Sequence, residues 1–211
     1  MYGTYLNLLP MWGDEAFTVL TVSESPAKII EIVRDDMHPP LYFLLAHWWN
    51  RLPIGSDPLL RLRALSALFT ILSTLILERP VFQSSLGPLR NWFLLFWGLS
   101  PCLLLYGRMA RSYSLQLLLA AVTISCMQKL LEKPVAVKSL VAFAFSLSAL
   151  LYTHYLPGIS IWVGANLLLQ RQLKKNRASI WKSWIACNAI VVFLFTAVRG
   201  NFRGERVSGL E

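Results

Sequence analysis

Charged residues are scarce in this sequence. They make up only 15% of the 211 residues, whereas apolar types make up 55%. A soluble domain normally carries about 25% charged residues, so the deficit argues against a soluble domain and favours a membrane protein. The net charge is +9, but the lysines and arginines punctuate apolar blocks instead of forming a basic patch. We therefore attribute the charge to membrane topology and predict no nucleic-acid partner.

Cysteine is also rare, and its distribution argues against two further classes of protein. The three cysteines, Cys102, Cys126 and Cys187, all lie within apolar runs and show no CxxC spacing. This pattern is not that of a zinc site or of a disulfide framework. The first residues lack a basic segment followed by a long apolar run, so we predict no signal peptide. The sequence also lacks internal repeats and low-complexity segments.

Long stretches without any acidic or basic residue are the main positive feature. They are Ala64–Leu77, Asn91–Gly107, Ser112–Gln128, Ser139–Gln170 and Ser183–Val198. A helix that crosses the hydrocarbon needs roughly 17–25 residues, so the shorter blocks require flanking polar residues at the interface. The longest block is long enough for two helices, and "THYLPG" (Thr153–Gly158) near its middle predicts a turn. We therefore predict an all-α, polytopic bundle of six transmembrane helices, at 59–78, 91–107, 112–130, 138–153, 157–170 and 183–198.

The basic residues orient these helices. Half of the twenty lie in alternate connections, namely Arg79, Arg90, Lys129, Lys133, Lys138, Arg171, Lys174, Lys175, Arg177 and Lys182. The positive-inside rule assigns these connections to the cytoplasm. All of the eleven acids except Glu78 and Glu132 then fall on the opposite face. We predict an extracytoplasmic N-terminal region at 1–58, a transmembrane bundle at 59–198 and an extracytoplasmic tail at 199–211.

The N-terminal region differs from the spans. Ser25 followed by Pro26 predicts the start of a short helix, with Ile29 and Val33 on its apolar face. The aromatic-rich run His38–Asn50 is too short to cross a bilayer. We expect this run to lie in the membrane interface as a juxtamembrane helix.

The predicted topology gathers several ionisable residues on one face. The acid pair Asp14–Glu15 is, by itself, most often a solvated loop. Arg108 and Arg111 alone fit lipid-headgroup anchors as well as a binding site, and His38 and His154 alone fit turn residues. On a shared face, however, arginine would grip a lipid-linked phosphate. A carboxylate close by would take the proton from an attacking hydroxyl.

The order of several motifs resembles a known family. The motifs are "WGDEAFT", "IIEIVRDDMHPPLYFLLAHWW", "DPLLRLRALSALFTIL", "ARSYSLQLLL" and "LYTHY". In this order and spacing, the chain from Trp12 to about Tyr155 resembles bacterial integral-membrane glycosyltransferases of the GT-C superfamily. Within that superfamily it is similar to the branch related to protein O-mannosyltransferases and the lipid A aminoarabinose transferase.

This resemblance implies a polyprenyl-phosphate-linked sugar donor and an active site on the extracytoplasmic face of the plasma (inner) membrane. The acceptor would be a hydroxyl or amine of a glycan, lipid or protein. Asp14 would be the general base, and Glu15 would support it or orient an acceptor or metal. A carboxylate pair can hold a divalent cation, but the sequence leaves metal use open and fixes no cofactor.

The resemblance also implies a set of substrate-binding residues. Arg111 would contact the donor phosphate with Arg108 close by, His38 would lie near the donor, and Tyr113 and His154 would line the cavity. The chain departs from the family at Met109, where an acid is common. Family members also begin with a transmembrane helix before the acid pair and continue past this chain's last residue, so we expect an interior piece of a longer enzyme.

Two other classes of protein stay open. The chain could be a non-catalytic membrane subunit or transporter fragment, or a truncated and inactive glycosyltransferase. A transporter would be expected to carry ionisable groups at mid-membrane. The uncharged blocks that form the middle of the predicted spans have none apart from His154 at a turn, which argues against transport.

Overall fold

The computed structural model describes residues 10–82, 89–132, 137–173 and 178–204. Every regular element in these segments is an α-helix, which confirms the all-α prediction. The segments 133–136 and 174–177, which contain predicted cytoplasmic lysines and arginines, lie outside the described residues. So do residues 205–211 of the predicted tail.

Three short helices form the N-terminal region: α1 (Gly13–Ser23), α2 (Pro26–Asp35) and α3 (Leu41–Asn50). The predicted start of α2 is confirmed, because the Ser25 hydroxyl accepts the Lys28 backbone N–H at 3.4 Å. The aromatic-rich run forms α3.

Helix α1 carries the acid pair, whereas an acid pair taken by itself most often lies in a solvated loop. Asp14 and Glu15 lie in its first turn, where the free backbone N–H groups and the helix dipole favour negative charge. Sequence patterning missed this helix because its apolar residues are interrupted by Thr18 and Thr21.

In the part of the chain that the structure describes, seven helices follow where six were predicted: α4 (Pro58–Phe82), α5 (Arg90–Gly98), α6 (Pro101–Tyr106), α7 (Tyr113–Glu132), α8 (Val137–Leu151), α9 (Tyr155–Leu173) and α10 (Ala178–Gly204). The predicted helix at 91–107 is wrong in one respect, because it is broken between α5 and α6. Pro101 has no N–H for the helical ladder, and it forces Ser100 out of the helical region to ψ 121°. The turn predicted at Thr153–Gly158 is present around His154. Pro157 and Gly158, however, lie inside the first turn of α9.

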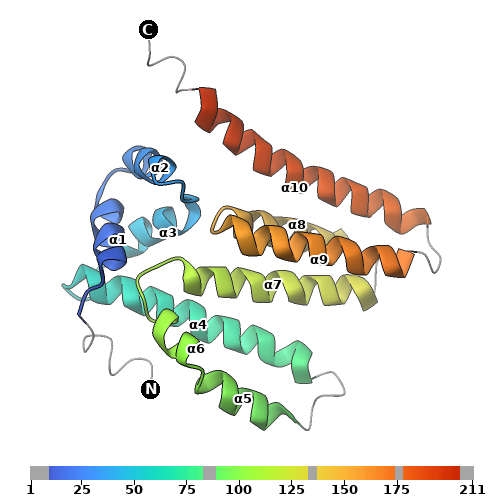
Figure 1. The fold of residues 1–211 in the computed structure, drawn as a ribbon, viewed down its shortest axis with the longest axis horizontal. Coiled ribbons are helices and arrows are strands. Elements are labelled where there is room, and N and C mark those ends of the chain that lie inside the picture. The colour runs from blue at the N-terminus through green and yellow to red at the C-terminus, as the bar shows by residue number, and fades with distance from the viewer. Residues whose placement is uncertain (1–9, 83–88, 133–136, 174–177, 205–211) are drawn as a thin grey trace.

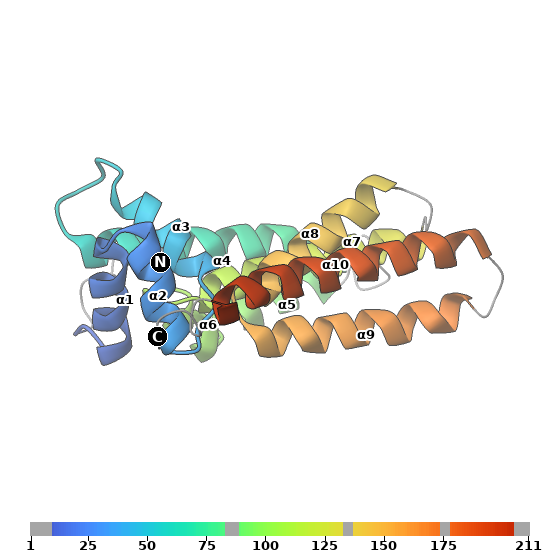
Figure 2. The same cartoon turned by 90° about the horizontal axis from the view of Figure 1, so that it is seen from above.

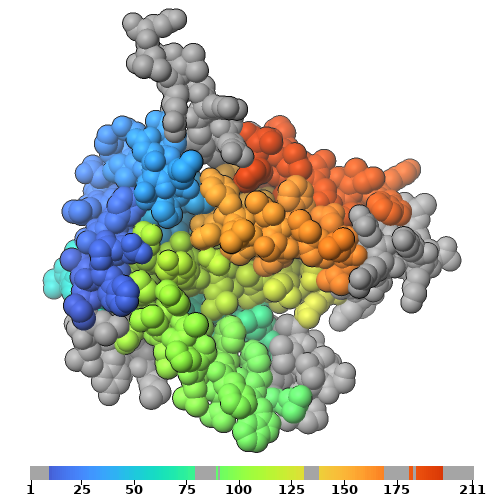
Figure 3. Space-filling view, in the orientation of Figure 1, coloured from blue at the N-terminus to red at the C-terminus, as the bar shows by residue number. Residues whose placement is uncertain are grey.

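The helices run back and forth along one long axis. Figures 1 and 2 show α1–α3 at one end, together with the α6–α7 connection, the α8–α9 turn and the start of α4. The opposite ends of α4, α7, α8 and α9 lie at the far end. In the space-filling view the surfaces of α1–α3, the α6–α7 connection and the start of α9 adjoin (Figure 3). The segments that carry the predicted site residues therefore share one end of the molecule.

Helix α7 belongs to both parts of the hydrophobic core. One buried cluster joins α1–α4 to the start of α7 through Tyr42, Leu62 and Leu115. The second joins the far end of α7 to α8–α10 through Leu130 and Phe143, among others. A single helix thus connects the N-terminal region to the last three helices.

Helices α9 and α10 are joined by polar side chains. Asn188 Oδ1 accepts from Trp162 Nε1 at 2.6 Å and from Asn166 Nδ2 at 3.2 Å, while Trp184 Nε1 donates to Asn166 Oδ1 at 3.0 Å. These hydrogen bonds link the two helices through their side chains.

One helical segment of the described residues is both long and apolar enough to cross a bilayer. It is Pro58–Glu78, with a mean hydropathy of 1.7. Three shorter apolar segments are Lys138–Leu151, Tyr155–Leu168 and Trp184–Thr196. Length and composition alone therefore establish one candidate span in this part of the chain.

We predict that Gly107→Ala destabilises the protein by about 1–3 kcal/mol. An added Cβ would press into the Leu103 carbonyl oxygen and lie 2.9 Å from Thr70 Oγ1, which donates to the Gly107 carbonyl at 3.0 Å. Gly164→Ala in α9 is the matched control, because its Cβ would meet nothing within 4 Å. That change is expected to be neutral or stabilising. Thermal unfolding of the purified variants, followed by circular dichroism, checks the difference, and equal unfolding temperatures would contradict it.

Candidate active site

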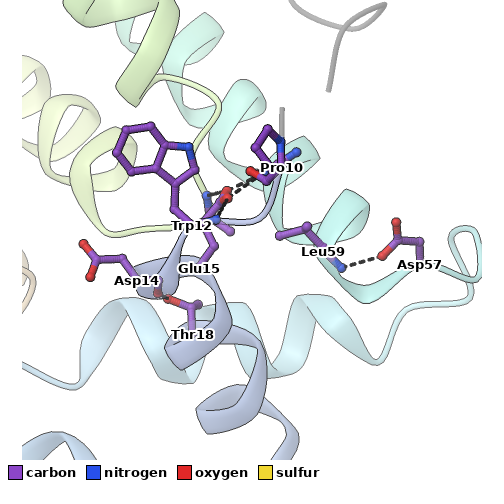
Figure 4. A network of polar contacts seen from close by, with 9 residues as sticks. Pro10, Trp12, Asp14, Glu15, Thr18, Asp57 and Leu59 are labelled. Atoms are coloured by element: carbon purple, nitrogen blue, oxygen red, sulfur yellow. Dashed lines mark hydrogen bonds and ion pairs between the residues drawn. The ribbon is translucent and has the colours of Figure 1, made fainter. Parts of the chain in front are cut away.

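Glu15 is buried and fully hydrogen-bonded. Its Oε1 accepts from Arg63 Nε at 2.9 Å, and its Oε2 accepts from Arg63 Nη2 at 2.6 Å. Oε1 also accepts the backbone N–H of Ala110 at 3.0 Å, and Oε2 accepts that of Trp12 at 3.2 Å. Two hydrogen bonds on each oxygen use the ordinary capacity of a carboxylate. Figure 4 shows Glu15 and Trp12 of this network from close by.

The charge of Glu15 is stabilised despite its burial. Burial alone would raise the pKa of Glu15, because a low-dielectric interior disfavours the charged form. The hydrogen bonds from Arg63 and from the Ala110 and Trp12 N–H groups outweigh this effect, and the pKa of Glu15 is lowered. Glu15 is therefore ionised at neutral pH. Because the two side chains are only 1% and 4% exposed, removing one partner would leave an uncompensated buried charge, at a cost of about 3–5 kcal/mol.

Asp14 has a different environment from its neighbour. Its carboxylate points away from the Glu15 network (Figure 4), and its side chain is 59% exposed. Oδ2 of Asp14 lies 3.7 Å from Nη2 of Arg111. The two adjacent acids therefore do not form a shared ligand pair, and one of them is open to solvent beside a cation.

Arg111 is held over an aromatic ring. Its side chain is only 12% exposed, and the guanidinium carbon lies 5.9 Å from the centre of the Phe17 ring. Stacking of this kind orients the planar guanidinium and leaves its N–H groups available at the edge. Phe17 comes from the second turn of α1, so the helix that carries Asp14 also positions Arg111.

The buried hydrogen bonds of Glu15 determine the relative position of the exposed Asp14 and its partner Arg111. Glu15 accepts the N–H of Ala110, and each of these two residues has a site residue next to it in the chain. Asp14 precedes Glu15, and Arg111 follows Ala110. A hydrogen bond in the interior therefore brings together two segments 95 residues apart and sets the Asp14–Arg111 distance.

The two predicted histidines lie near each other on a neighbouring part of this end. The backbone N–H of Leu41 donates to the Tyr152 carbonyl at 3.2 Å, which joins the segment after His38 to the segment before His154. Burial lowers the pKa of His154, and the charge of His38 lowers it further. His154 is therefore neutral at neutral pH.

An aromatic series connects His38 to the Asp14–Arg111 pair. The His38 ring packs edge-on against Phe43 with centroids 6.3 Å apart, and Phe43 packs against Phe17 at 5.9 Å. Phe17 in turn lies under Arg111. Phe43 is buried, so this series links His38 to Arg111 through the interior of the protein.

Tyr113 and Arg108 lie on the α6–α7 side of the site. The Tyr113 ring packs edge-on against Tyr106, with centroids 5.0 Å apart, and lines a cavity between α6 and α7. Arg108 is half-buried and engaged within the protein. The predicted substrate-binding residues thus divide between a histidine side and a tyrosine side, with Arg111 between them.

Sequence reasoning missed Arg63. It lies one residue before the first uncharged block and is buried in α4. A signal was available, because an arginine inside an apolar helix is costly unless an acid or a polar cavity compensates its charge. That argument calls for a carboxylate partner but does not identify Glu15.

The described residues give no structural indication of a metal site. No group of three or more His, Cys, Asp or Glu side chains in that part of the chain is suitably arranged to hold a metal ion. The carboxylate of Glu15 is also already saturated by protein donors.

The fold and site together define an all-helical protein with an exposed acid–arginine pair at one end, built on a buried ion pair. Comparison of the chain with protein-family models, with curated proteins and with solved structures finds no match.

We predict that Glu15→Gln lowers the free energy of unfolding by about 3–5 kcal/mol, because Arg63 would keep a buried charge without a counter-charge. A double variant, Glu15→Leu with Arg63→Met, should lose less free energy of unfolding than the sum of the losses in the single variants Glu15→Leu and Arg63→Met. Glu31→Gln is the control, since its ion pair with Lys28 is half-exposed and should contribute little. Additive losses in the double-mutant cycle would contradict the pairing.

The same pair predicts a pH dependence. The pKa of Glu15 is lower in the folded protein than its ordinary value of 4.5, so the folded state binds fewer protons than the unfolded state near that pH. The stability that Glu15 provides is present above about pH 4.5 and is lost as the pH falls through the folded pKa. Unfolding measured between about pH 7 and pH 3 should show a flatter acid limb in Glu15→Gln than in the wild type. Identical limbs would contradict the prediction.

Proposed function

We propose that this chain is part of a membrane glycosyltransferase that moves a sugar from a polyprenyl-phosphate donor to an acceptor hydroxyl or amine. The observation that carries the proposal is the exposed Asp14 carboxylate 3.7 Å from the oriented Arg111 guanidinium. A base beside a phosphate-binding cation is the arrangement this transfer needs. The resemblance of the motif order to GT-C enzymes supports the same assignment.

A membrane setting is supported by the outer surface of the helices. Large apolar side chains are exposed on separate helices, among them Phe96 on α5, Phe145 on α8 and Phe193 on α10, at 68%, 74% and 68%. A soluble monomer rarely exposes so much apolar surface. We propose that α4, the α5–α6 pair, α7, α8, α9 and α10 form six crossings of the plasma membrane. The α1–α3 end would then be extracytoplasmic.

The proposed reaction is a direct displacement at the anomeric carbon of the sugar. Asp14 takes the proton of the acceptor hydroxyl or amine as the new bond to the sugar forms. The bond between the anomeric carbon and the phosphate oxygen breaks, and the bond electrons remain on the phosphate. Arg111 stabilises the negative charge of that leaving group.

Glu15 has a positioning role in this proposal. Its lone pairs are already used by Arg63, Ala110 and Trp12, so it has no ordinary acceptor capacity left for a substrate. Glu15 instead fixes the backbone positions that set Asp14 and Arg111 side by side.

We expect Asp14→Asn to lower sugar transfer by about 10²–10⁴-fold, because the amide cannot take the acceptor proton. The assay uses membranes that carry the whole chain in its genomic context and a panel of labelled polyprenyl-phosphate hexoses and pentoses. Glu24→Gln is the control, as another exposed acid at the far end of the same helix. Normal transfer by Asp14→Asn, with the wild type active, would disprove the assignment of the base. Absence of transfer by the wild type would favour a non-catalytic subunit or an inactive piece.

Arg111→Lys is expected to weaken donor use by about tenfold or more, although the charge is kept. Lysine lacks the planar fork that matches phosphate oxygens and does not stack on Phe17 in the same way. The loss should appear mainly as a raised KM for the donor, with the acceptor KM unchanged. An unchanged donor KM would show that the phosphate does not contact Arg111.

A further inference from the structure

A large aromatic side chain stands beside the candidate base. Trp12 precedes Asp14 by two residues and is 49% exposed. In Figure 4 the Trp12 ring and the Asp14 carboxylate both project away from the contacts of the Glu15 carboxylate. Within the described residues the indole N–H makes no hydrogen bond. Trp12 therefore offers a flat apolar face and one hydrogen-bond donor next to Asp14.

The backbone of Trp12 is fixed by the buried network. Its N–H donates to Glu15 Oε2 at 3.2 Å, and its carbonyl accepts the N–H groups of Glu15 and Ala16 at 2.9 and 3.0 Å. The exposed ring therefore projects from a rigid point, and a group that is already positioned loses less entropy when a ligand binds. Because these contacts use backbone atoms alone, replacing the side chain leaves them in place.

Helix α1 sets the order of the groups at the site. Trp12 lies at its start, Asp14 in its first turn, and Phe17, which carries the Arg111 guanidinium, in its second turn. At a rise of 1.5 Å per residue, Trp12 and Phe17 are about 7–8 Å apart along the helix axis. Asp14 thus lies between the indole and the cation.

This order assigns the two sides of the base to different substrates. In a direct displacement the acceptor attacks the anomeric carbon from the face opposite the leaving group. The proposed reaction has the leaving phosphate at Arg111 and the acceptor proton at Asp14. The acceptor therefore enters on the side of Asp14 that is away from Arg111, and Trp12 lies on that side.

The chemistry of the indole indicates what kind of acceptor fits. The face of an aromatic ring is apolar and carries partial negative charge, which suits the C–H groups on one face of a pyranose ring. The hydroxyls at the edge of such a ring can reach the indole N–H and the Asp14 carboxylate. A hydrocarbon acceptor would leave both polar groups without a partner. An extended peptide usually adds to the edge of a sheet, and the described residues contain no strand.

We propose that Trp12 forms the acceptor subsite and that the acceptor is a pyranose sugar, free in a glycan or in a glycolipid headgroup, stacked on the indole. The inference rests on the proposed function and narrows its acceptor from a hydroxyl or amine to a sugar hydroxyl. That hydroxyl oxygen bonds to the anomeric carbon, its proton passes to Asp14, and the bond electrons of the departing oxygen stay on the phosphate. Trp12 is then a specificity-determining residue.

Saturation-transfer NMR tests the subsite without requiring catalysis. The probes are methyl pyranosides, with glycerol as a polyol that has no ring, added to the whole chain in lipid nanodiscs. The C–H protons of the pyranosides should receive saturation from the wild type, and glycerol should receive little. Trp12→Leu should lose most of this signal, whereas Trp12→Tyr, which keeps an aromatic face and a donor, should retain much of it.

Trp48→Leu is the matched control. Trp48 is also an exposed tryptophan of the N-terminal region, at 60%, but its ring is occupied by Arg51, whose guanidinium carbon lies 5.3 Å from the ring centre. This variant should give the wild-type signal. A role of exposed tryptophans as membrane anchors would affect both positions alike. Circular dichroism verifies that all the variants are folded.

Steady-state kinetics then assign the subsite to the acceptor. With methyl pyranosides as acceptors and the labelled polyprenyl-phosphate sugars as donors, Trp12→Leu should raise the acceptor KM by about tenfold. The donor KM should stay unchanged, which distinguishes this variant from Arg111→Lys. Trp12→Tyr should fall between Trp12→Leu and the wild type.

The outcomes separate this inference from the proposed function. If the wild type transfers sugar but Trp12→Leu keeps the wild-type acceptor KM, or raises the donor KM instead, the inference is wrong and the proposed function stands. Equal saturation of glycerol, or an equal loss in Trp48→Leu, also overturns the inference. If pyranosides bind at Trp12 but the wild type transfers no sugar from any donor, the proposed function fails while the sugar site at Trp12 stands.

Discussion

The ion pair between Glu15 and Arg63 brings three segments of the chain to one point. Charges this deeply buried are unfavourable unless their hydrogen-bonding capacity is satisfied, and here the Glu15 carboxylate accepts four hydrogen bonds from α4, the α6–α7 connection and the start of α1. The geometry of the pair therefore restricts all three segments together. The exposed groups next to it, Asp14 and Arg111, take their relative position from this interior contact.

Buried contacts also fix the positions of the remaining helices, but these contacts are mainly apolar. Helix α7 packs against the N-terminal region at one end and against α8–α10 at the other, so the location of Arg111 is tied to the whole bundle. Hydrogen bonds between tryptophan and asparagine side chains join α9 to α10. The α5–α6 pair is set apart by the break at Pro101, and the cavity beside α7 lies along it.

Much of the helical architecture could be predicted from periodicity and charge. The uncharged blocks locate α4 and α7–α10, and Ser25–Pro26 locates α2, because these signals are local. The errors arose where a local signal was weak or was misread. Thr18 and Thr21 obscured the apolar face of α1, and Pro101 was included in a helix that it interrupts. The candidate site was only partly predictable: topology grouped Asp14, Arg111 and the histidines, but no pattern in the sequence joins residue 15 to residue 63.

The sequence by itself determined the residue types, the approximate helices and the end of the molecule at which the ionisable groups meet. These follow from hydropathy and from basic-residue asymmetry, which act over short stretches of chain. Only the tertiary structure decided that the two adjacent acids have different environments. A helix turns by about 100° per residue, so Glu15 points into the protein towards Arg63 while Asp14 points out towards Arg111. Which of the two acids points inward depends on the surfaces that pack against α1. The partners of Glu15 lie 48 and 95 residues away in the chain, so the sequence around Glu15 does not identify them.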